Sequence, residues 1–103
     1  MQNAKERGEQ LKSGLKTLQK KYPIIGDVRG IGLMIGVEFV HADKTPAAKE
    51  LDEILEVLKN RGFIIGKGGV GRNVMAFQPP LVINEKNVDD VLNALDLTLS
   101  EMN

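Results

Sequence analysis

Residues 33–40 read Leu33-Met34-Ile35-Gly36-Val37-Glu38-Phe39-Val40, and their alternation decides the fold of this chain. Successive side chains of a β-strand point to opposite faces of a sheet, so the odd-numbered apolar positions share one face. Glu38 then lies on the other face. If that face is buried, Glu38 needs a partner, for which Arg29 is a candidate, although an ordinary salt bridge at a strand edge explains the pair equally well.

Helical patterns surround this strand. Residues 2–21 place apolar side chains at spacings of three and four, which predicts a helix that Pro23 ends. The glycine-rich residues 24–32 that follow are interpreted as turns or close backbone approaches. A second helix is predicted to start at Thr45-Pro46, a favourable cap and first position, and to end at Gly62.

The remaining elements are shorter. Phe63-Ile64-Ile65 predicts a short strand, and Gly66 to Gly71 predict a flexible loop or hairpin. Val74 to Phe77 form another strand, which Pro79-Pro80 must end or place at an edge. Asn84 is expected to cap a last helix.

The resulting order, α-β-α-β-β-α, predicts an α+β fold and a single domain over residues 1–103. We expect a small, mainly antiparallel sheet with helices covering one face. Hairpin-length spacing favours pairing residues 63–66 with 74–77, whereas the strand at 33–40 must join across a helix.

Composition excludes several classes of protein. The 14 basic and 14 acidic residues balance, so no general attraction to nucleic acid or to an acidic membrane is expected. There is no cysteine, which excludes disulfides and thiol catalysis. No apolar run approaches the ~20 residues of a membrane span, and no signal peptide is visible. A cytoplasmic protein is the simplest interpretation.

Local motifs give no catalytic site. The loop Gly66-Lys67-Gly68-Gly69 resembles a phosphate loop only superficially, because a strand follows it where a P-loop needs Ser or Thr and a helix. His41, the one histidine, has Asp43 nearby but too few further ligands for a metal. From residue patterns alone, a soluble α+β domain is predicted and no reaction is selected.

Two longer motifs add a family. The run from Gly26 to Glu38 resembles the "D-V-R-G-x-G-L-M-x-G-V-E" signature of class-III (subgroup II) pyridoxal-phosphate aminotransferases. The run from Asn73 to Ile83 is similar to the family's "N-V-x-R-x-x-P-P-L-x-I" segment. The resemblance covers essentially the whole chain. Residues 44–47 and 65–69 most resemble the alanine–glyoxylate and 4-aminobutyrate branch.

The resemblance implies that this chain is the small C-terminal domain of a larger, homodimeric enzyme. The parent would transfer an amino group between an amino acid or amine and a 2-oxo acid. Its Schiff-base lysine, the aspartate on the pyridine nitrogen and its phosphate-binding loop belong to the large PLP-binding domain, which would be the partner of this chain. Lys67 has the wrong surroundings for the Schiff-base lysine. No catalytic and no cofactor-binding residue is therefore expected here, and the chain alone should be inactive.

One position departs from the family pattern. Ala76 stands where the family usually has Arg, which resembles a clamp for the substrate carboxylate. Either the parent acts on another amine or runs another PLP reaction, such as racemisation or lyase chemistry, or Arg72 supplies the charge. Strand alternation would place residues 72 and 76 on one face, although an exposed loop position is the plainer interpretation of Arg72. Arg72, Ala76 and Gln78 are therefore the candidate substrate-binding residues.

Two alternatives remain open. The chain could be a stand-alone binding or regulatory α+β domain, or an enzyme in its own right, although it lacks any assembled nucleophile or acid–base set. If it is the C-terminal domain of an aminotransferase, we expect apolar surface left bare where the large domain sits, around the first helix.

Overall fold

The computed structural model describes residues 2–31, 34–63, 65–69, 71–77 and 85–102 of the chain. Its elements are three helices and four strands: α1 (Gln2–Lys21), β1 (Ile25–Ile31), β2 (Met34–Phe39), α2 (Ala48–Asn60), β3 (Gly66–Gly68), β4 (Val74–Phe77) and α3 (Glu85–Met102). The predicted α+β class is confirmed. The expected order lacked one strand, β1.

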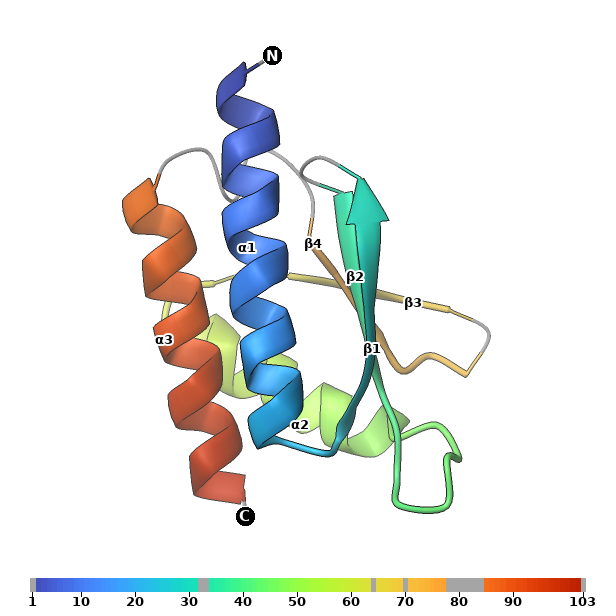
Figure 1. Ribbon diagram of the computed structural model, residues 1–103. Helices are drawn as coiled ribbons and strands as arrows, with labels where there is room; N and C mark the ends of the chain where they lie inside the picture. The colour runs from blue at the N-terminus through green and yellow to red at the C-terminus, as the bar shows by residue number, and fades with distance from the viewer. Residues whose placement is uncertain (1, 32–33, 64, 70, 78–84, 103) are drawn as a thin grey trace.

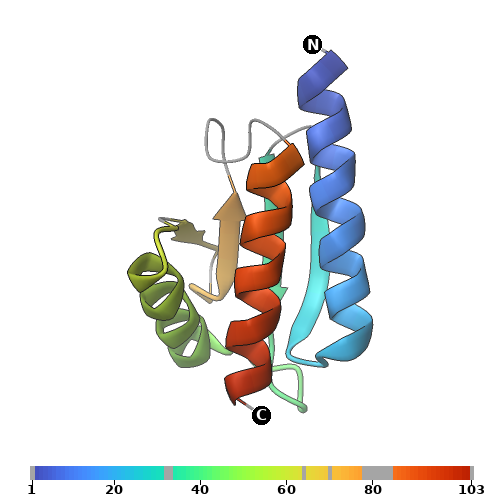
Figure 2. The same ribbon diagram turned by 90° about the vertical axis from the view of Figure 1, so that its left-hand side faces the viewer.

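The four strands form one antiparallel sheet in the order β1-β2-β4-β3. All three helices cover the same face of this sheet, and α3 lies between α1 and α2 (Figures 1 and 2). The predicted antiparallel pairing of the two late strands is confirmed, but its first strand is Gly66–Gly68 and does not include Phe63 or Ile65, so part of the predicted loop forms the strand. The expected pairing of β2 across a helix is also confirmed, because β2 pairs with β4 across α2.

The core lies between the sheet and the helices. The inward-facing positions alternate along β2 and β4, as the sequence predicts, and helix stripes pack onto them. The largest side chains that are almost fully buried include Phe39, Phe77, Leu11, Leu15, Leu51, Ile54, Leu58, Met75 and Leu95. Truncating one such residue to Ala typically costs about 2–5 kcal/mol. The stability of the domain therefore resides on the helix-covered side of the sheet.

Of the two interpretations of the glycines in residues 24–32, strand β1 replaces the turns, while a close backbone approach is found at Gly26. Glycines inside a strand weaken it, and here one of them marks an irregularity. The register shifts between Ile25 and Asp27, which places Gly26 in a bulge. A Cβ at Gly26 would lie 2.8 Å from Val40 Cγ2, so glycine lets the two chains approach closely. Pairing with β2 along the rest of β1 overrides the local signal.

The start of α2 also differs from the prediction. The helix begins at Ala48 after Ala47, and no side chain caps it. The Thr45 hydroxyl donates instead to Asp43 Oδ1 at 2.6 Å, and Pro46 forms a bridge with Val40. The other end is as predicted. Gly62 has φ +98°, and Phe63 N donates to Leu58 O at 2.9 Å, the pattern of a glycine-terminated helix. The expected cap at Asn84 lies outside the described residues.

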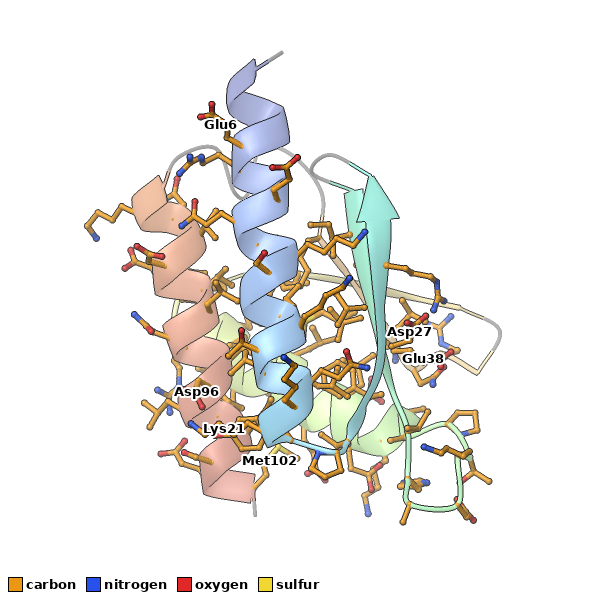
Figure 3. All side chains as sticks on the ribbon, in the orientation of Figure 1. Glu6, Lys21, Asp27, Glu38, Asp96 and Met102 are labelled. Carbon is orange, nitrogen blue, oxygen red and sulfur yellow. The ribbon has the colours of Figure 1, made fainter. Side chains whose placement is uncertain are left out.

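A polar contact joins α1 to α3. The Tyr22 hydroxyl donates to Asp96 Oδ1 at 2.6 Å, and Lys21 Nζ donates to the same oxygen at 3.0 Å. Figure 3 shows Lys21 and Asp96 facing each other near the end of α1. The hydrogen bond from Tyr22, followed by that from Lys21, lowers the pKa of Asp96. The contact fixes the two helices in register over the sheet.

Candidate functional site

The face of the sheet turned away from the helices carries the positions that the motifs single out. Two rows of paired residues cross the four strands on this outer face. The rows are Arg29, Gly36, Ala76 and Gly66, then Asp27, Glu38, Val74 and Gly68. Asp27 and Glu38 project from the side opposite the helices in Figure 3. We refer to these eight residues as the outer face.

Ala76 occupies a flat part of the outer face. It pairs with Gly36 on one side and with Gly66 on the other, so three neighbouring strands present nothing larger than a methyl group. A Cβ built at Gly66 would lie 3.9 Å from Ala76 Cβ, an ordinary contact. Ala76 itself is half-buried. The surface can therefore accept a larger side chain, or a ligand, above this position.

The charged residues lie at one edge of the flat part. Arg29 Nη1 donates to Asp27 Oδ2 at 2.7 Å within the same strand. Arg29 was the candidate partner of Glu38 in case the outer face were buried. Glu38 is only half-buried, so it does not need a partner, and no ion pair joins it to any described residue. Arg29 is thus already neutralised by Asp27.

A hollow of about 430 Å³ adjoins this charged edge. Its walls come from β1, β2, β4 and the two loops that precede α2 and β4. The lining residues are Arg29, Glu38, Val40, Lys44, Pro46, Gly69, Gly71, Asn73 and Val74. Asn73 is buried and anchors the wall, because its Nδ2 donates to Phe39 O at 2.7 Å.

The three candidate substrate-binding residues fall in different places. Ala76 lies on the outer face, as alternation along β4 predicts. Arg72 is exposed but does not continue that alternation, because β4 begins at Val74 and Arg72 has φ +54° in a turn closed by its N–H to Gly69 O. Gln78 lies outside the described residues. Residue patterns could not identify Gly36 and Gly66 as neighbours of Ala76, since that requires the register between strands.

Lys67 lies on the helix-covered side of β3, where its Nζ donates to Asp52 of α2. The two residues line a second hollow of about 370 Å³ with Leu55, Glu56, Lys59 and Ile65. Lys67 therefore faces away from the outer face. The expectation that Lys67 is no Schiff-base lysine stays a prediction.

His41 is exposed and lies in a hydrogen-bonded cluster with Thr45 and Glu50. Within the described ranges, no group of three or more His, Cys, Asp and Glu side chains is arranged to hold a metal. In the same part of the chain, no helix is both long and apolar enough to cross a membrane.

Bare apolar surface lies on a different helix from the one expected. Among side chains whose exposure is described, the large hydrophobic residues that remain exposed are Leu97 and Met102 of α3. Leu11, Leu15 and Leu18 of α1 are buried against the sheet and α3. For the part of α1 whose side chains are described, residues 6–21, the expectation was wrong, because the apolar stripe packs within the domain.

Comparison with known proteins gives consistent matches. The profile of the aminotransferase class-III family matches residues 1–99. Alanine–glyoxylate aminotransferase 2 homolog 2, a mitochondrial protein of Arabidopsis thaliana, is 44% identical over 103 residues, covering 98% of this chain and 22% of that protein.

Solved structures agree. A phospholyase from Arthrobacter, in complex with phosphoethanolamine, superposes with a TM-score of 0.90 at 28% identity, over 95% of this chain and 24% of that one. An aminotransferase from Bacillus anthracis gives 0.85 at 29% identity, over 96% and 24%. The chain thus spans about a quarter of the length of the proteins it matches.

Proposed function

Because this chain belongs to the class-III aminotransferase family, we propose that it is the C-terminal small domain of a larger pyridoxal-phosphate enzyme. The parent would transfer an amino group between an amino acid or amine and a 2-oxo acid. The observation that carries the proposal is the family match over residues 1–99 together with coverage of only 22% of the Arabidopsis protein. The family depends on pyridoxal phosphate in general, and the cofactor would supply the electron sink for the reaction.

The described residues do not fit a cofactor site by themselves. The outer face contains no lysine, and Lys67 is held by Asp52 on the opposite side of the sheet. No reaction step is therefore assigned to this chain. Its role would be to form the substrate side of an active site whose cofactor is held by the large domain, in a parent enzyme that is a homodimer.

A cofactor titration tests this division of labour. We expect the purified chain mixed with pyridoxal phosphate to show no specific Schiff-base absorbance, and replacing Lys67 by Arg should change nothing. The matched control is Lys44→Arg, at the hollow beside the outer face. A stoichiometric aldimine that disappears with one lysine variant would contradict the proposal.

A lyase acting on an amine is the second candidate for the parent reaction. It is favoured by Ala76, which leaves position 76 without the guanidinium that would bind a substrate carboxylate, while Arg29 on the same face is already paired with Asp27. The phospholyase with a TM-score of 0.90 is a structural relative whose bound ligand, phosphoethanolamine, is an amine. Arg72 is a poor substitute for the clamp, given its place in an exposed turn.

Substrate profiling of the full-length protein separates the candidates. The protein and its Ala76→Arg variant are tested on a panel of amines and amino acids, for amino transfer and for elimination. If a carboxylate clamp belongs at position 76, the variant should gain activity on carboxylate-bearing substrates. An unchanged profile would show that position 76 does not select the substrate.

The stand-alone domain remains the alternative outside the enzymes. Sequencing the coding DNA upstream of Met1 decides the matter, since an open reading frame encoding a PLP-lysine domain would establish the parent. The cytoplasmic location stays a prediction, and the Arabidopsis relative is described as mitochondrial.

A further inference from the structure

A chain of four polar side chains joins the loop between β2 and α2 to the helix: His41, Asp43 and Thr45 of the loop and Glu50 of α2. His41 Nδ1 lies 2.9 Å from Thr45 Oγ1, and His41 Nε2 lies 3.0 Å from Glu50 Oε2. Thr45 Oγ1 in turn donates to Asp43 Oδ1 at 2.6 Å. The imidazole ring of His41 thus connects the loop to the first turn of α2.

The direction of each hydrogen bond follows from the proton count. A threonine hydroxyl has only one proton to donate. Of the two contacts of Thr45 Oγ1, the shorter one, to the Asp43 carboxylate, is the stronger hydrogen bond and uses that proton. Thr45 Oγ1 can therefore only accept at His41 Nδ1. Glu50 Oε2 also accepts, from His41 Nε2. Both ring nitrogens must carry a proton for both contacts to form, so the arrangement suits the imidazolium ion.

Both carboxylates are poised as acceptors. Hydrogen bonds from the Thr45 side chain and backbone lower the pKa of Asp43. Hydrogen bonding from the backbone of Glu50 itself, then from His41, lowers the pKa of Glu50. Glu50 Oε1 is buried and has no hydrogen-bond partner in the described part of the chain, so His41 is the side chain that balances this carboxylate.

The loop is held in a conformation that needs such support. Lys44 has φ +73°, unfavourable for a residue with a side chain. His41 N donates to Thr45 O, and Lys44 N donates to His41 O, each at 2.9 Å. A Cβ at Gly71 would lie 2.7 Å from Pro46 Cγ, so the loop packs closely against the turn before β4. Lys44 and Pro46 also line the hollow beside the outer face.

We propose that His41, Asp43, Thr45 and Glu50 form a proton-dependent latch that holds the 41–46 loop against α2 and thereby fixes one wall of the hollow. The latch is closed when both nitrogens of His41 carry a proton, and it loosens when one proton leaves. Lys49 beside Glu50, Lys44 in the loop and Arg72 in the adjoining turn are the other charged groups of these segments. No cofactor or parent enzyme is needed for the device to operate.

The sign of the pH dependence follows from proton binding. The closed latch holds one more proton on the imidazole than the open one, so raising the pH opens it. At strongly acidic pH, protonation of Asp43 and Glu50 removes the acceptors and also opens the latch. Because the pKa of each carboxyl is lowered, this second opening falls below the ordinary carboxyl range.

Amide exchange measured by NMR on the 103-residue chain tests the proposal. The amides of His41 and Lys44 are followed from pH 5 to 9, corrected for the intrinsic rate, alongside the His41 ring nitrogens. We expect their protection to fall roughly two- to fivefold, the size of one exposed ion pair, in step with the ring titration. Loop protection that stays constant while the ring titrates, or a ring with a single proton while the loop is protected, would overturn the latch.

Variants separate the latch from ordinary loop packing. Glu50→Gln keeps the shape but removes the charge, and should move both the ring and loop transitions to lower pH. Glu53→Gln changes an exposed residue of the same helix and should leave both transitions in place. His41→Asn should abolish the pH dependence of the loop. Equal behaviour of Glu50→Gln and Glu53→Gln would contradict the proposal, and the wild-type titration decides alone if a variant fails to fold.

Discussion

At the scale of single residues, neighbouring positions of β4 face opposite environments. Met75 is fully buried against the helices, whereas Ala76 lies half-buried on the outer face between two glycines. Met75 therefore contributes to the stability of the fold, whereas Ala76 contributes to the chemistry of the surface. The period of two along a strand makes this separation possible.

A pair of arginine substitutions tests the separation. Ala76→Arg should change the free energy of unfolding by less than about 1 kcal/mol, because the side chain extends from an open surface. Met75→Arg places a charge in the core and should prevent folding or cost several times more. Urea denaturation of both variants measures the difference. Comparable destabilisation by the two would show that the outer face is not open in this chain.

At the scale of elements, local sequence predicts helices better than it predicts β1. The stripe of Leu11, Leu15 and Leu18 specifies α1, and Gly62 ends α2 with its left-handed backbone. Because Gly26 and Gly30 are unfavourable in a strand, the local sequence does not predict β1. The strand forms through its pairing with β2, which is a non-local effect. Helix α2 begins at Ala48 and not at the predicted Thr45-Pro46, because the Thr45 hydroxyl bonds with Asp43 instead of capping the helix.

The close approach at Gly26 can be tested by a double-mutant cycle. Gly26→Ala should cost about 1–3 kcal/mol, because the new Cβ would lie 2.8 Å from Val40 Cγ2. Val40→Ala removes that methyl group, so the double variant should lose less stability than the sum of the single variants. Thermal unfolding of the wild type, the two single variants and the double variant gives the coupling energy between positions 26 and 40. Simple additivity would mean that β1 accommodates a side chain at position 26 without Val40 limiting it.

The contact between α1 and α3 predicts a pH effect. The pKa of Asp96 is lowered in the folded chain, chiefly by the hydrogen bond from Tyr22. Such a group contributes stability above the ordinary carboxyl pKa, and the contribution is lost as the pH falls through the lowered value. Tyr22→Phe should therefore lower Tm at neutral pH and make less difference in acid.

Asp90→Asn provides the matched control for that measurement. Asp90 belongs to the same helix and pairs only with the exposed Lys86 at 2.9 Å among the contacts described. Its replacement should shift Tm little at any pH. A Tyr22→Phe effect that is the same at neutral and acidic pH would assign the loss to packing instead of to the Asp96 carboxylate.

At the scale of the whole molecule, the sheet order places β2 and β4 at the centre and β1 and β3 at the edges. Amides of β2 and β4 are therefore expected to exchange only when the domain unfolds, whereas β3, three residues long, should open locally at least about tenfold more often. Hydrogen exchange measures this directly. Equal protection across the sheet would mean that β3 is stabilised by more than its pairing with β4.

Local sequence determines only part of the outer face, because the rest depends on how the strands pair. The alternation in β4 puts Ala76 on the same face as Val74 and opposite the buried Met75 and Phe77. Arg72 could not be placed, because the strand stops at Val74 and a turn intervenes. The row that joins Arg29, Gly36, Ala76 and Gly66 depends on the register of four strands, which no local pattern contains.

The helices cover only one face of the sheet, and this has a consequence for how such a domain can diverge over time. Mutations at positions 74 and 76 alter the outer face without disturbing the core, while positions 75 and 77 are constrained to stay apolar. Lineages can therefore explore new surface chemistry by single steps that leave folding intact. Saturation mutagenesis of β4 should display this as a tolerance that rises and falls with every second residue.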